Sequence, residues 1–60
     1  MLKETGRRLA GLMIAEGIAD TSTDLFLDAW RMAGRVGCQQ LHRESVAYYA
    51  VENLKNRQPA

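Results

Sequence analysis

Cysteine, histidine and proline each occur only once in the 60-residue sequence. Because Cys38 is the only cysteine, the chain cannot form an internal disulfide. Because His42 is the only histidine, a zinc ion would take most of its ligands from carboxylates, which is unusual for a structural zinc site. Disulfides and metals are the usual supports of very small proteins, and here neither they nor a bound cofactor are expected.

Long apolar runs and a large excess of one charge are also absent. No stretch approaches the roughly 20 apolar residues of a membrane span, and we expect no signal peptide. Eight basic and seven acidic residues give a net charge of +1, with the two signs interspersed. Nonspecific binding to phosphate backbones usually requires a stronger basic surface. We therefore expect a cytoplasmic protein that does not bind membranes, and we rank nucleic acid below protein as its partner.

The composition is typical of a small globular domain, with 47% hydrophobic and 25% charged residues. We expect one helical domain over residues 1–56 and a frayed tail over residues 57–60, which contains the only proline, Pro59. A chain of this length buries only about 60% of the surface that its unfolded form exposes. Oligomerisation is therefore the expected source of additional stability.

The first helix is predicted from about Leu2 to Glu16, with apolar residues on a broad arc of its surface. The next seven residues, 17–23, contain the clearest break in the sequence. Gly17 is suited to close the first helix, and Thr21 or Ser22 is suited to cap the start of the next. The chain is therefore predicted to turn here before a second helix begins.

The extent of that second helix is the main structural question. Gly34 and Gly37 favour a stop, but residues 38–44 contain no Ser, Thr, Asp or Asn to cap a further helix. The apolar residues before and after this segment also fall on one continuous helical stripe. Two separate helices would have no reason to keep their stripes aligned in this way. We therefore predict an all-α helical hairpin, with a short first helix and a long second helix from about Thr23 to Lys55, kinked at most near Gly37. A three-helix chain with a turn between residues 37 and 42 is the alternative.

Self-association follows from the unequal lengths of the two predicted helices. A helix of about 33 residues is about 50 Å long, and the first helix covers less than half of that length. The uncovered apolar stripe then needs a second copy of the chain, and the simplest closed arrangement is a two-fold dimer that forms a four-helix bundle. The residues expected to pack in the core or dimer interface of this bundle are Ala29, Ala33, Gly37, Val46, Ala50 and Leu54.

Catalysis is not expected. Cys38 and His42 are four residues apart and would share a helix face as nucleophile and base, but no third group is placed to orient the histidine. The sequence also has no phosphate-binding glycine loop and no metal-ligand spacing, and a chain this short has little depth to enclose a pocket. We therefore interpret the protein as non-enzymatic.

Binding to another protein is the function that we predict. In the last third of the chain, the side opposite the apolar stripe is polar but carries almost no charge, with Tyr49 at its centre, which suits protein contact better than solvent. Trp30 and Arg31 form a second candidate anchor of the type common at interfaces. The residues predicted to bind a partner are His42, Arg43, Ser45, Tyr49, Asn53, Trp30 and Arg31.

The predicted role is that of a small regulator or inhibitor of a larger protein, a class often encoded by phages, plasmids and bacterial operons. The alternative is a dimeric DNA-binding transcriptional regulator. The spacing of Ala33 and Gly37 resembles that of a helix-turn-helix, which would make residues 40–49 the recognition helix. The chain departs from that pattern at Arg43, which occupies a position that is buried in such motifs.

The proposed dimer leads to a first test. At micromolar concentration the protein is expected to sediment as a dimer, because one copy leaves part of its apolar stripe uncovered. Ala33→Asp is expected both to dissociate the dimer and to unfold the chain, because it places an unpaired charge on the most tightly packed face. A mass near 6.7 kDa at sedimentation equilibrium, constant over a tenfold range of concentration, would contradict the dimer.

Overall fold

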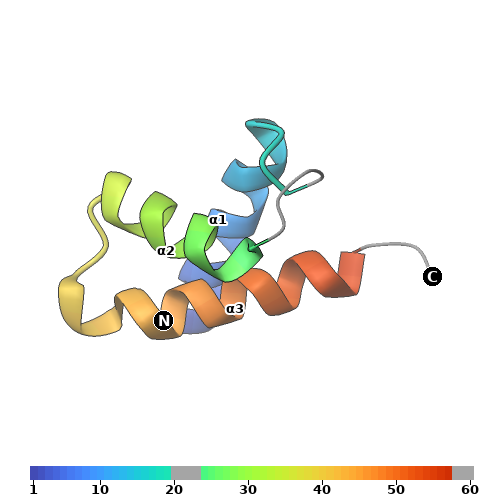
Figure 1. The fold of residues 1–60 in the computed structure, drawn as a ribbon. Coiled ribbons are helices and arrows are strands. Elements are labelled where there is room, and N and C mark those ends of the chain that lie inside the picture. The colour runs from blue at the N-terminus through green and yellow to red at the C-terminus, as the bar shows by residue number, and fades with distance from the viewer. Residues whose placement is uncertain (20–23, 58–60) are drawn as a thin grey trace.

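The computed structural model describes residues 1–19 and 24–57, and this part of the chain is all-helical as predicted, with no strand. It contains α1 (Leu2–Ala15), α2 (Leu25–Arg35), a short 3-10 turn η1 (Gln40–His42) and α3 (Arg43–Arg57). Figure 1 shows α3 along one side of the molecule, with α1 and α2 packed against it. None of these helices has the length and apolar character needed to span a membrane.

The predicted long helix from Thr23 to Lys55 is wrong, because the chain turns between α2 and α3. Gly37 has a φ of 84°, a left-handed conformation that glycine adopts without steric cost. Its N–H donates to the carbonyl of Gly34 at 3.2 Å. The next N–H, that of Cys38, donates to the carbonyl of Ala33 at 3.0 Å. Glycine commonly ends helices with this pair of hydrogen bonds, and the three-helix alternative is therefore the fold.

The residues after the turn show how α3 begins without a capping side chain. Gln39 is extended, with a φ of −59° and a ψ of 136°, and its carbonyl accepts the N–H of His42 at 2.9 Å. This hydrogen bond forms η1, which supplies the first turn before α3. The apolar stripes of α2 and α3 keep a common phase because both helices face the same core, although no single helix joins them.

The start of α2 is capped by Asp24, whose Oδ1 accepts the N–H of Leu27 at 3.0 Å. A carboxylate in this position satisfies an N–H that has no partner within the helix. The helix begins at Leu25, slightly later than predicted. The predicted caps Thr21 and Ser22 lie outside the described residues.

The end of α1 agrees with the prediction, and α3 extends to the first residue of the predicted tail. Gly17, with a φ of 74°, closes α1 by the same pair of hydrogen bonds that ends α2. Arg57 is still the last residue of α3. The rest of the predicted tail, residues 58–60, lies outside the described part of the chain.

Small side chains dominate the core, and they allow the helices to approach closely. The closest approach is at Gly6 of α1, where an added Cβ would overlap the Cβ of Tyr49 and crowd the main chain of Ala50 in α3. No polar or charged side chain of the described residues is buried. The buried apolar residues are Leu9, Ala10, Met13, Ala19, Ala29, Met32, Ala33, Val46, Ala47, Ala50 and Leu54.

The residues predicted to pack in the core or at a dimer interface are nearly all buried within a single chain. Gly37 is the exception, because it lies exposed in the turn after α2, where its role is conformational. Since α1 and α2 cover the apolar stripe of α3, one copy leaves no long stripe open for a second. The dimer therefore stays a prediction, but the uncovered apolar stripe on which it was based is not present in the described residues. The buried members of the set are Ala29, Ala33, Val46, Ala50 and Leu54.

The turn at Gly37 can be tested by substitution. Gly37→Ala is expected to lower the free energy of unfolding by about 1 kcal/mol, because a residue with a Cβ is strained at positive φ. Gly11→Ala is the matched control, since Gly11 lies in the middle of α1 and an added Cβ would meet no other atom. This control is expected to raise the free energy of unfolding by about 0.5 kcal/mol. Urea unfolding followed by circular dichroism measures the free energy of unfolding of both variants. If the two substitutions changed it equally, the left-handed turn at Gly37 would be contradicted.

Candidate functional site

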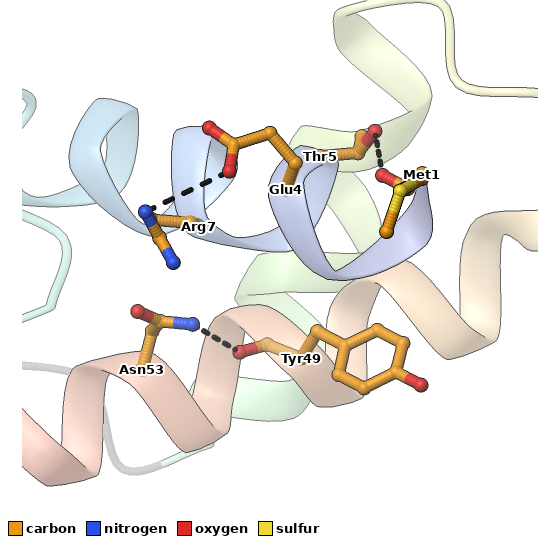
Figure 2. Close-up of polar contacts among 6 residues, drawn as sticks. All are labelled: Met1, Glu4, Thr5, Arg7, Tyr49 and Asn53. Carbon is orange, nitrogen blue, oxygen red and sulfur yellow. Dashed lines mark hydrogen bonds and ion pairs between the residues drawn. The ribbon is translucent and has the colours of Figure 1, made fainter.

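The α3 face that was predicted around Tyr49 is partly covered by α1. Gly6 packs against the Cβ and main chain of Tyr49, which is half-buried. The carbonyl of Tyr49 accepts a hydrogen bond from Nδ2 of Asn53, one turn later, at 3.2 Å. Figure 2 shows these two residues beneath the first turns of α1, with Arg7 facing the same space. At Tyr49 the predicted docking face is therefore in part a contact between helices of one chain.

The remaining predicted partner-binding residues are spread over different parts of the surface. His42 is half-buried in η1, and Ser45 is exposed on α3. On α2, Arg31 is exposed and Trp30 is half-buried. The structure therefore brings no single exposed surface together from the predicted set.

Arg43 and Trp30, both predicted as partner-binding residues, bind each other. The guanidinium carbon of Arg43 lies 3.4 Å from the centroid of the Trp30 ring, a cation–π contact. Its Nε also donates to the Trp30 carbonyl at 2.7 Å. The same guanidinium fills the space beside Gly34, where an added Cβ would overlap it. This contact fixes the beginning of α3 against α2 and uses both side chains within the chain.

The exposed aromatic ring of α3 belongs to Tyr48, on a different side of the helix from Tyr49. Tyr48 is 60% exposed, and its ring lies 4.5 Å from the ring of Phe26, measured between centroids. Leu41, seven residues earlier in η1, is 84% exposed. A hollow of about 320 Å³ beside Tyr48 is bordered by the charged residues Glu52 and Lys55. We call the lining of this hollow, together with the exposed Leu41 and Ser45 that precede it in the chain, the Tyr48 surface; it comprises Leu41, Ser45, Tyr48, Val51, Glu52 and Lys55.

Sequence reasoning missed this surface for a geometric reason. Tyr48 and Tyr49 are 100° apart on the helix and flank the apolar stripe on opposite sides, at similar angles from its centre. The sequence pattern does not say which flank the first helix covers. The structure shows that α1 lies over the Tyr49 flank, which leaves the ring of Tyr48 more exposed.

A second hollow lies between α1 and the turn that follows α2. It is an apolar groove of about 210 Å³, with the buried Leu9 and Val46 and the half-buried Cys38 among its lining residues. Leu12 and Val36 also line it, and they are 44% and 52% exposed. We call it the Leu12 groove; its lining residues are Thr5, Arg8, Leu9, Leu12, Val36, Cys38 and Val46.

The residues considered for catalysis or metal binding are not brought together in the described part of the chain. Cys38 lies in the turn and His42 in η1, so the two do not share an α-helical face as the sequence spacing suggested. Among residues 1–19 and 24–57, no group of three or more His, Cys, Asp or Glu side chains is placed to hold a metal ion. The two hollows are therefore the features of the described surface that suit binding.

Comparisons with protein families, curated proteins and solved structures found no match to this chain.

The contact between Arg43 and Trp30 makes a specific prediction about stability. Arg43→Lys is expected to lower the free energy of unfolding by about 1 kcal/mol, because lysine keeps the charge but loses the planar group that stacks on the ring. Arg31→Lys, on an exposed part of α2, is the control and is expected to change it by less than about 0.5 kcal/mol. The Arg43→Lys effect is expected to shrink in a Trp30→Leu background, which removes the ring but keeps the main-chain carbonyl that accepts from Nε. An undiminished effect there would show that the stacking is not its source.

Proposed function

We propose that this protein is a small non-enzymatic regulator or inhibitor that acts by binding a larger protein through the Tyr48 surface. The observation that carries the proposal is the exposure of two large apolar side chains, Tyr48 on α3 and Leu41 seven residues earlier in η1. Single exposed apolar residues are common on protein surfaces. At Tyr48 the exposed ring stands beside a hollow that Val51 also lines, and an apolar patch of this kind is typical of a docking site.

The chemistry of the Tyr48 surface supports protein contact. Its centre is aromatic and aliphatic, while Glu52 and Lys55 form a charged border, which is the usual arrangement of an apolar centre and polar rim at interfaces. Tyrosine is a common anchor because it buries a large area with few rotatable bonds. The neighbouring ring of Phe26 limits the freedom of the Tyr48 ring, so less conformational entropy is lost on binding.

The proposed role is inhibition or regulation by covering a partner's surface, as expected for an accessory protein of a phage, plasmid or bacterial operon acting in the cytoplasm. A chain of 60 residues influences a larger enzyme or receptor most simply by occupying its surface. Homodimerisation through the same apolar patch is a further proposal. It rests on the exposure of Leu41 and Tyr48 and no longer on the stripe of α3.

DNA binding is the second candidate, and the turn at Gly37 favours it. The sequence α2, turn, α3 has the order of a helix-turn-helix, with Ala33 buried and Gly37 at the break. Two observations weigh against it. Glu44 and Glu52 are exposed on α3, where they would repel phosphates, and Arg43 is held by Trp30. We therefore rank it below protein binding.

The protein-binding proposal predicts the behaviour of a double variant, Leu41→Ala with Tyr48→Ala. Both side chains are largely exposed, so the variant is expected to fold normally. It is expected to lose at least about 2 kcal/mol of binding free energy, roughly 30-fold in affinity, because truncated aromatic anchors typically cost that much. Proteins captured by the immobilised wild type from cells that carry the gene identify the partner, and titration of the purified partner then measures the loss.

Ile14→Ala is the matched control, because Ile14 is an exposed apolar residue on α1, 47% exposed, outside both hollows. It is expected to bind like the wild type, and Tyr48→Phe is expected to keep most of the affinity because it keeps the ring. Equal capture by the double variant and the wild type would show that the partner does not use this surface. Binding to random duplex DNA that weakens steeply with added salt would instead favour the second candidate.

A further inference from the structure

The Leu12 groove is formed by residues that the Tyr48 surface does not use. It lies where α1 passes the turn after α2, with buried apolar side chains inside and the exposed Leu12 and Val36 beside them. A dry apolar cavity of about 150 Å³ is large enough to bind benzene. The groove, at about 210 Å³, therefore has room for one aromatic ring or one branched aliphatic side chain. Water in such a groove finds few hydrogen-bond partners, so an apolar group displaces it favourably.

Among the described residues that line the groove, Arg8 is the only charged one. Within the described part of the chain Arg8 makes no ion pair or hydrogen bond, whereas Arg7 pairs with Glu4 at 3.7 Å and Arg35 pairs with Glu16 at 3.2 Å. The guanidinium of Arg8 is therefore available to a carboxylate from outside. Arginine suits this role because its planar group binds a carboxylate through two parallel hydrogen bonds.

We propose that the Leu12 groove binds a protein segment in which one large apolar side chain is flanked by Asp or Glu. The apolar side chain enters between Leu12 and Val36, and a neighbouring carboxylate pairs with Arg8. Leu12 and Val36 are exposed at the groove, so a side chain reaches it from a segment that lies across the surface. This site goes beyond the proposed function, because it uses α1 and the turn where the Tyr48 surface uses η1 and α3.

A fluorescent acidic peptide provides the test. The probe is a short labelled peptide with one tryptophan between glutamates, and its matched forms carry alanine in place of tryptophan or lysine in place of glutamate. Fluorescence anisotropy is expected to show saturable binding of the probe and much weaker binding of both matched forms. Arg8→Gln is expected to weaken probe binding about fivefold, and Leu12→Ala about tenfold. Arg7→Gln and Ile14→Ala are the matched controls and are expected to bind like the wild type.

Cys38 reports occupancy of the groove directly, because its thiol lies in the lining. Reaction of Cys38 with a thiol reagent is expected to slow when the probe is bound. The Leu41→Ala, Tyr48→Ala variant is expected to bind the probe normally. The proposal for the Tyr48 surface and the proposal for the groove can therefore be contradicted independently of each other.

Three outcomes would overturn the groove proposal. The first is the absence of saturable binding, and the second is equal binding of the lysine peptide. The third is protection of Cys38 that rises with protein concentration when no probe is present, because the occupant would then be a second copy of this chain.

Discussion

The left-handed turn at Gly37 determines how the rest of the chain packs. By reversing the chain after α2, it lays α3 against α2 and leaves the other flank of α3 to α1 (Figure 1). In a continuous helix the two halves of the apolar stripe would lie one after the other along the same axis and could not pack against each other. The turn instead closes the core within one chain, and it also determines which side chains of α3 remain exposed.

The sequence was sufficient to predict the helical class, the first helix and most of the core. Apolar residues at helical spacing predicted burial correctly at Ala29, Val46 and Leu54, because burial depends on periodicity whether or not the helix is continuous. The same periodicity was misleading at Gly37. Two helices that face one core keep their stripes in phase, so a common phase is weak evidence for a continuous helix.

The candidate site was harder to predict because it depends on contacts between residues distant in the sequence. The pattern around Arg43 was compatible with a free charge at the rim of an interface, but nothing local to it indicates that Trp30, 13 residues earlier, lies within reach. Which of Tyr48 and Tyr49 is more exposed also depends on a distant contact, because it is decided by the flank of α3 that the first helix covers. The Leu12 groove joins α1 to the turn after α2, so its existence depends on a turn that the predicted hairpin lacked.

A core built largely from alanine has a thermodynamic consequence. Each buried alanine removes little apolar area from water, and the heat capacity change of unfolding grows with the apolar area that unfolding exposes. In a chain of 60 residues both this change and the unfolding enthalpy are small. The free energy of unfolding then varies only gently with temperature, so the folded state is lost over a wide temperature range and not at a sharp melting point.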